Sequence, residues 1–118
     1  MYSTSFRVTI RYMAKTNDLT QQILAFLFEK RVYAWRQNTT GVFDKTHGVY
    51  RLAAKKGVAD ILACRNGQFL AFEIKIGRDK LSSEQAGFIK SINAAGGFAC
   101  VISSFDQFLG VYAQLDKG

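Results

Sequence analysis

The chain has 118 residues, a length that suits one compact domain over 1–118, and 48% of them are hydrophobic, which excludes disordered and low-complexity classes. The longest uninterrupted apolar run covers only residues 23–28, far short of the roughly 20 residues of a membrane span, and the first residues form no signal peptide. We therefore expect an intracellular protein with no membrane partner.

The net charge of +7 is concentrated in the first half of the chain. Residues 1–59 hold ten Lys/Arg and three Asp/Glu, whereas the two signs balance over residues 60–118. A basic surface of this kind favours a polyanionic partner, and nucleic acid is the first candidate.

The first half of the chain predicts two strands and a helix. Residues 6–12 alternate apolar with polar side chains, which predicts a half-exposed strand at a sheet edge or in an arm. Residues 16–18 supply N-cap candidates for a helix that ends near residue 30. A strand is predicted over 32–38, with Trp35 assigned to the core, followed by a polar loop over 39–48 and a short extended segment over 49–52.

The second half predicts a hairpin and then a helix, a strand and a helix. Strands over 59–65 and 68–76 flank Asn66 and Gly67, a pair typical of two-residue hairpin turns. Ser82 and Gln85 fit a capping box for a helix to residue 95, and an apolar strand over 98–103 precedes a last helix from residue 104. The order predicts an α/β domain with a mixed sheet. Both cysteines, Cys64 and Cys100, are expected to be buried thiols.

The hairpin brings two acidic side chains together. With Asn66 and Gly67 at the centre of the turn, Asp60 opposes Glu73, and opposed residues point to the same face of a sheet. Two carboxylates about 5 Å apart repel by roughly 3 kcal/mol at an effective dielectric of about 20. A shared proton would relieve this repulsion, but a hard divalent cation suits the oxygen ligands better.

Strand periodicity also places Lys75 on the face of Glu73. A metal ion lowers the pKa of a bound water, and a lysine beside it stabilises developing charge, which together suit phosphodiester hydrolysis. The alternative interpretation is a salt bridge among these three side chains without chemistry.

Five motifs occur in the sequence at residues 35–39 (WRQNT), 57–60 (GVAD), 73–75 (EIK), 77–85 (GRDKLSSEQ) and 94–97 (AAGG). Taken in this order, they resemble the virus-type replication-repair nuclease domain (VRR-NUC) of the PD-(D/E)xK nuclease superfamily. The resemblance implies a restriction-endonuclease-like mixed β-sheet flanked by helices. It also implies a cytoplasmic enzyme encoded by a bacterium or phage.

The resemblance assigns roles to individual residues. Asp60, Glu73 and the backbone carbonyl of Ile74 would bind Mg²⁺ or Mn²⁺, Lys75 would serve the attacking water, and Gln85 matches the glutamine of the family's motif. The carboxylate that the family carries on its first helix corresponds to Asp18, with Glu29 as the other candidate three helical turns later, and Ala59 replaces the usual proline. Candidate DNA contacts are Arg36, Asn38, Lys55, Lys56, Arg78 and Lys80.

These assignments predict a metal-dependent DNA endonuclease that acts on branched or Holliday-junction DNA, as a homodimer. One alternative is a non-catalytic DNA-binding or replication-accessory module on the same fold. Another is a nuclease directed at RNA, because phosphate contacts do not distinguish the sugars.

Overall fold

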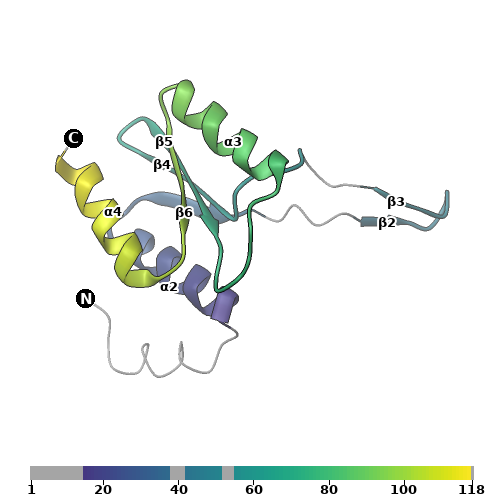
Figure 1. The fold of residues 1–118 in the computed structure, drawn as a ribbon, viewed down its shortest axis with the longest axis horizontal. Helices are drawn as coiled ribbons and strands as arrows, with labels where there is room; N and C mark the ends of the chain where they lie inside the picture. The colour runs from purple at the N-terminus through teal and green to yellow at the C-terminus, as the bar shows by residue number, and fades with distance from the viewer. Residues whose placement is uncertain (1–14, 38–41, 52–54, 118) are drawn as a thin grey trace.

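The computed structural model describes residues 15–37, 42–51 and 55–117 (Figure 1). Their main sheet has four strands in the order β1 (Tyr33–Arg36), β4 (Ile61–Arg65), β5 (Gln68–Ile74) and β6 (Phe98–Ile102). The pairs β1–β4 and β4–β5 are antiparallel, and β5–β6 is parallel. The predicted mixed sheet is therefore confirmed, whereas the strand predicted over residues 6–12 lies outside the described residues.

Three helices cover the two faces of this sheet: α2 (Lys15–Glu29), α3 (Ser83–Ala94) and α4 (Phe105–Lys117). Because neighbouring residues of a strand point to opposite faces, Ile61 and Phe72 pack with α2 and α4, and Leu62 and Ala71 pack with α3. In Figure 1 the strands lie between α3 on one side and α2 and α4 on the other. The fold is α/β, with a sheet flanked by helices as in the predicted restriction-endonuclease-like arrangement.

Aromatic packing joins the two helices on one face. The ring of Phe108 in α4 is fully buried and lies edge-on to Phe72 of β5, with ring centroids 5.3 Å apart, and to Phe26 of α2, at 5.5 Å. Edge-to-face pairs of this kind stabilise a core beyond the area that they bury. The final helix is therefore fixed against both the sheet and the first helix.

The predicted hairpin has the predicted register. Ile61 pairs with Phe72 and Arg65 with Gln68, and the turn residue Asn66 has a φ of 51°. Asparagine tolerates this left-handed conformation, which a two-residue hairpin turn requires. This register places residue 60, just before β4, next to residue 73, near the end of β5.

Four sequence interpretations are wrong in detail. The polar loop predicted over 39–48 contains a strand, β2 (Val42–Asp44). Trp35 is 39% exposed, because β1 is the edge strand of the sheet that the described residues form. Cys64 is exposed as well, while Cys100 is half-buried and burial raises its pKa to about 11. The first helix begins at Lys15, so Asn17 lies inside it and is not its N-cap. Among the described residues, no helix is long and apolar enough to cross a membrane.

Candidate functional site

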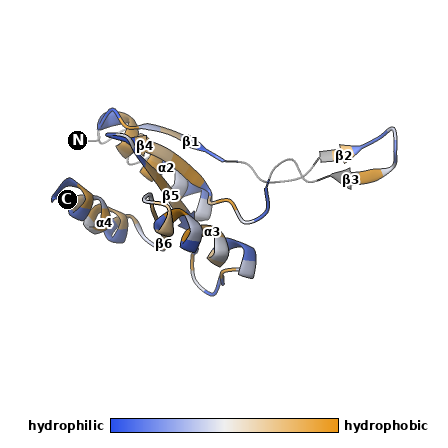
Figure 2. Ribbon diagram, turned by 90° about the horizontal axis from the view of Figure 1, so that it is seen from above, coloured by the Kyte–Doolittle hydropathy of each residue, from blue (hydrophilic) through white to orange (hydrophobic). Residues whose placement is uncertain are grey.

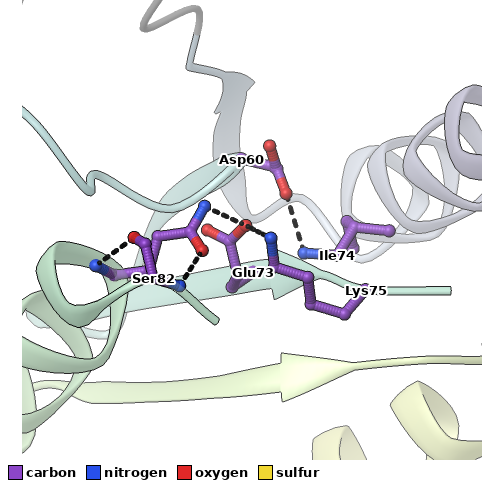
Figure 3. A network of polar contacts seen from close by, with 6 residues as sticks. Asp60, Glu73, Ile74, Lys75 and Ser82 are labelled. Atoms are coloured by element: carbon purple, nitrogen blue, oxygen red, sulfur yellow. Dashed lines mark hydrogen bonds and ion pairs between the residues drawn. The ribbon is translucent and has the colours of Figure 1, made fainter. Parts of the chain in front are cut away.

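The candidate site lies where β4 begins and β5 ends (Figure 3). Asp60 immediately precedes β4, and Glu73 is the second-last residue of β5, so the hairpin register extended by one position places them opposite each other. We refer to these two residues as the carboxyl pair. Lys75 follows the end of β5 and points to the same face, as strand periodicity predicts.

Glu73 is almost completely enclosed, with only 3% of its surface exposed. Its Oε2 atom lies 3.6 Å from Nζ of Lys75 and accepts a hydrogen bond of 3.1 Å from Nε2 of Gln85. Buried carboxyl groups need such partners, because desolvation without compensation costs several kcal/mol. The two contacts hold the Glu73 carboxyl group in one orientation.

Asp60 is fixed by the backbone of the neighbouring strand. Its Oδ2 atom accepts a hydrogen bond of 2.8 Å from the Ile74 N–H, and its carbonyl oxygen accepts one of 2.7 Å from the Gln37 N–H. The side chain is therefore tied to β5 and the main chain to the end of β1. Ile74, predicted as a backbone metal ligand, is thus in direct contact with Asp60.

The pKa of Glu73 is raised to about 7 from its ordinary value of 4.5. Burial is the largest cause, followed by the charge of Asp60 and a hydrogen bond between the two carboxyl groups, while Lys75 acts in the opposite direction. Without a cation, the carboxyl pair therefore retains a proton near neutral pH. Because metal ligands must be deprotonated, a cation that binds here would displace this proton.

Gln85 connects the site to the start of α3. Its Oε1 atom accepts the Ser82 N–H at 2.9 Å, and Ser82 Oγ accepts the Gln85 N–H at 3.1 Å, which completes the predicted capping box. The same amide group donates to Glu73 through Nε2. The capping role and the site role are thus both present in one side chain.

We expect Ser82→Ala to lower the free energy of unfolding by about 1 kcal/mol, because the first turn of α3 loses its side-chain cap. Chemical denaturation of the variant and of Ser83→Ala, whose neighbouring hydroxyl does not cap the helix, measures the difference. Equal stability of the two variants would contradict the capping role.

A glycine allows the chain before Asp60 to lie against α3. Gly57 has a φ of +81°, and a Cβ atom placed on it would lie 2.4 Å from the backbone carbonyl carbon of Glu84. No other residue fits at this approach without a shift of the backbone. The close contact sets Asp60 and the helix that carries Gln85 at a fixed relative position.

Asp18 lies in the first turn of α2, at the same end of the sheet as the carboxyl pair. The link is Arg36, which pairs with Ile61 beside Asp60 and donates from Nη1 to Asn17 Oδ1 at 2.5 Å. Burial raises the pKa of Asp18, and its Oδ1 atom is buried without a hydrogen-bond partner. The other candidate, Glu29, is exposed near the opposite end of α2, roughly 16 Å along the helix.

The donor chemistry of this site fits a hard cation. The carboxyl pair offers oxygen atoms only, and the orphaned Asp18 Oδ1 is a further oxygen without a partner at this end of the sheet. Within the described residues, no group of three or more His, Cys, Asp or Glu side chains could hold a metal ion. Mg²⁺ is commonly held by one or two carboxylates and completed by water and substrate phosphate, which suits two acidic side chains.

Four of the six predicted DNA contacts lie close to the carboxyl pair in the sequence. Lys55 and Lys56 are exposed and lead into Gly57, and Arg78 and Lys80 are exposed between β5 and α3. Arg36 is exposed and donates a hydrogen bond to Asn17, a contact that was not predicted because Asn17 was expected to be a helix cap. Asn38 lies outside the described residues.

Comparison with known proteins adds no assignment to this geometry. No protein-family model matches the chain, and no curated protein matches its sequence.

Proposed function

We propose that the protein is a divalent-metal-dependent nuclease that hydrolyses phosphodiester bonds in DNA. The observation that carries this proposal is the carboxyl pair, in which Glu73 is buried and lies 3.6 Å from Lys75 Nζ, in a chain with a net charge of +7. Paired acidic residues and a lysine on one face suit metal-assisted attack of water on a phosphate. The resemblance to the VRR-NUC domain supports the same assignment.

Each residue of the site has a task in this reaction. Asp60 and Glu73 would hold Mg²⁺ or Mn²⁺, which supplies a polarised phosphoryl oxygen and a more acidic water when bound. The Lys75 ammonium group orients the attacking water or stabilises the charge that develops on the phosphate. Gln85 keeps the Glu73 carboxyl group oriented, and the exposed Lys55, Lys56, Arg78 and Lys80 attract the phosphates of the substrate.

The resemblance extends the proposal to branched or Holliday-junction DNA and to a homodimer. Two sites related by a two-fold axis would suit the cutting of two strands. The alternative function is a DNA-binding or replication-accessory module without catalysis. It is favoured by one observation, the lack of a third acidic side chain grouped with the carboxyl pair among residues 15–37, 42–51 and 55–117.

Metal dependence tests the proposal. The protein is incubated with duplex, flap, single-stranded and four-way-junction DNA, and with RNA of matched sequence, in Mg²⁺, in Mn²⁺ and in EDTA. We expect DNA cutting with either metal and none in EDTA, together with metal uptake in calorimetry. Binding of DNA without cutting at any metal concentration would favour the accessory module.

A further inference from the structure

A second, separate sheet forms a hairpin that stands away from the main domain. Within the part of the chain that the structure describes, strands β2 (Val42–Asp44) and β3 (Val49–Arg51) pair only with each other, and in Figure 1 the hairpin projects far to the side of the body. The view from above in Figure 2 shows the same projection. We refer to residues 42–51 as the β2–β3 arm.

The arm is rooted beside the carboxyl pair. Before the arm, the last described residue of the body is Gln37, whose N–H donates to the Asp60 carbonyl oxygen. After the arm, Lys55 and Lys56 lead back to Gly57, which lies against α3. Lys45 follows Gln37 by eight residues, a length of chain that reaches at most on the order of 28 Å. The arm can therefore contact nucleic acid up to about eight base pairs from the site, at about 3.4 Å per base pair.

Most of the side chains that the structure describes in the arm are exposed, and the arm has a net positive charge. Phe43 is 54% exposed and Val49 is 44% exposed, although both are apolar, and Lys45 is exposed at the turn. Residues 42–51 hold two basic residues, Lys45 and Arg51, and one acidic residue, Asp44, and two further lysines, Lys55 and Lys56, follow the arm in the sequence. Asp44 is engaged inside the turn, where its carboxylate accepts the N–H groups of Thr46 and His47 and contacts the His47 ring at 2.8 Å.

We propose that the β2–β3 arm binds in the major groove of a DNA duplex that flanks the scissile phosphate. The major groove of B-DNA admits a two-stranded β-ribbon, whereas the major groove of an RNA duplex is too narrow for side chains to read and a single strand has no groove. Lys45 contacts phosphates, and Phe43 supplies apolar contact with the bases. This inference rests on the proposed function and deepens it, because it makes double-stranded DNA next to the cut the recognised substrate.

Equilibrium binding without metal tests the arm separately from cutting. Fluorescence anisotropy measures the affinity of the protein for a DNA duplex, one of its strands and the matching RNA duplex over a range of salt concentrations, in EDTA. In Lys45→Ala, the slope of log affinity against log salt for the DNA duplex falls by about 1. When a Gly/Ser loop replaces residues 42–51, Lys45 is lost together with the rest of the arm, and the slope falls by at least as much as in Lys45→Ala.

Two further variants separate the arm from general charge. Phe43→Ala lowers affinity for the DNA duplex without a change in salt slope, because the contact is apolar. The control variant Lys117→Ala removes the same charge as Lys45→Ala, but at the end of α4. This position lies far from the arm, because the neighbouring Asp116 is paired with Arg65, at the end of the sheet opposite the carboxyl pair. The duplex affinity and slope of this control stay at the wild-type values, and none of the arm variants changes affinity for the single strand or the RNA duplex to the same degree.

Several outcomes overturn the inference. One is that the arm variants bind the DNA duplex as tightly as the wild-type protein does. Another is that Lys117→Ala weakens duplex binding as much as Lys45→Ala. A third is that the arm variants keep their affinity but no longer form dimers, which would make the arm a protein contact. Cutting by the wild-type protein alongside normal duplex binding by the arm variants would overturn the arm while the nuclease proposal stands. Arm-dependent duplex binding without any cutting would support the arm and contradict the nuclease.

Discussion

Replacement of Glu73 by glutamine is expected to lower the rate of DNA cutting by about 100-fold or more, because the loss of a metal ligand should cost at least as much as the roughly 10–100-fold that follows the loss of a residue that only supports one. The substitution removes the partner of Lys75 and the negative charge that is proposed to hold the metal, but it keeps the size of the side chain and a carbonyl oxygen for the bond from Gln85 Nε2. The loss should therefore appear in cutting and not in folding. Single-turnover cutting of the preferred substrate in Mg²⁺ measures it.

The matched control is Glu84→Gln, which makes the same chemical change on an exposed side chain in the first turn of α3. It should cut within a few-fold of the wild-type rate. Both variants should bind DNA as the wild-type protein does in EDTA, because the basic residues around the site are unchanged. Cutting by Glu73→Gln at the rate of the Glu84→Gln control would remove Glu73 from the reaction.

The stability of the metal-free protein should fall as the pH rises from about 4.5 to about 7. The pKa of Glu73 is about 7 in the folded state and near 4.5 when the chain is unfolded, so the folded state holds more protons over this interval. Stability decreases with pH wherever the folded state binds more protons than the unfolded state. The titration of Glu73 should therefore make the free energy of unfolding about 3 kcal/mol lower above pH 7 than below pH 4.5.

Chemical denaturation in EDTA at pH 5 and pH 8 measures this change. In Glu73→Gln the neutral amide has no proton to lose, so the variant should be more stable than the wild-type protein at pH 8, while Glu84→Gln should follow the wild-type curve. Mg²⁺ should restore part of the wild-type stability at pH 8, because a cation that binds only the folded state stabilises it. A wild-type curve parallel to that of Glu73→Gln would show that Glu73 titrates normally.

Both expected effects have the same physical cause, the repulsion between the carboxyl groups of Asp60 and Glu73. Two carboxyl groups are brought together in a place where only 3% of Glu73 is exposed, and the ammonium group of Lys75 at 3.6 Å opposes the rise of the Glu73 pKa only in part. A proton or a cation relieves the remaining repulsion. Folding of the metal-free protein is favoured at lower pH, where Glu73 keeps its proton. Binding of a cation is favoured at higher pH, where Glu73 has lost it.

The local elements of this protein follow from the sequence by itself. Asn66 and Gly67 adopt the backbone conformations of a tight turn, and the turn fixes the register that brings Asp60 opposite Glu73. The capping box of Ser82 and Gln85 likewise depends on groups only three residues apart. Such features are predictable because the interacting groups are close in the chain, whatever the rest of the fold does.

Only the tertiary structure decided the surroundings of those elements. The burial of Glu73 and its bond to Gln85 depend on how α3 packs on the sheet, and the exposure of Trp35 depends on β1 lying at its edge. The contact between Arg36 and Asn17 joins residues 19 positions apart, and the projection of the β2–β3 arm depends on its pairing with no strand of the main sheet. Periodicity in a sequence states which face of an element is apolar, but which partner covers that face, and which side chains are left outside, is settled by the packing of distant segments.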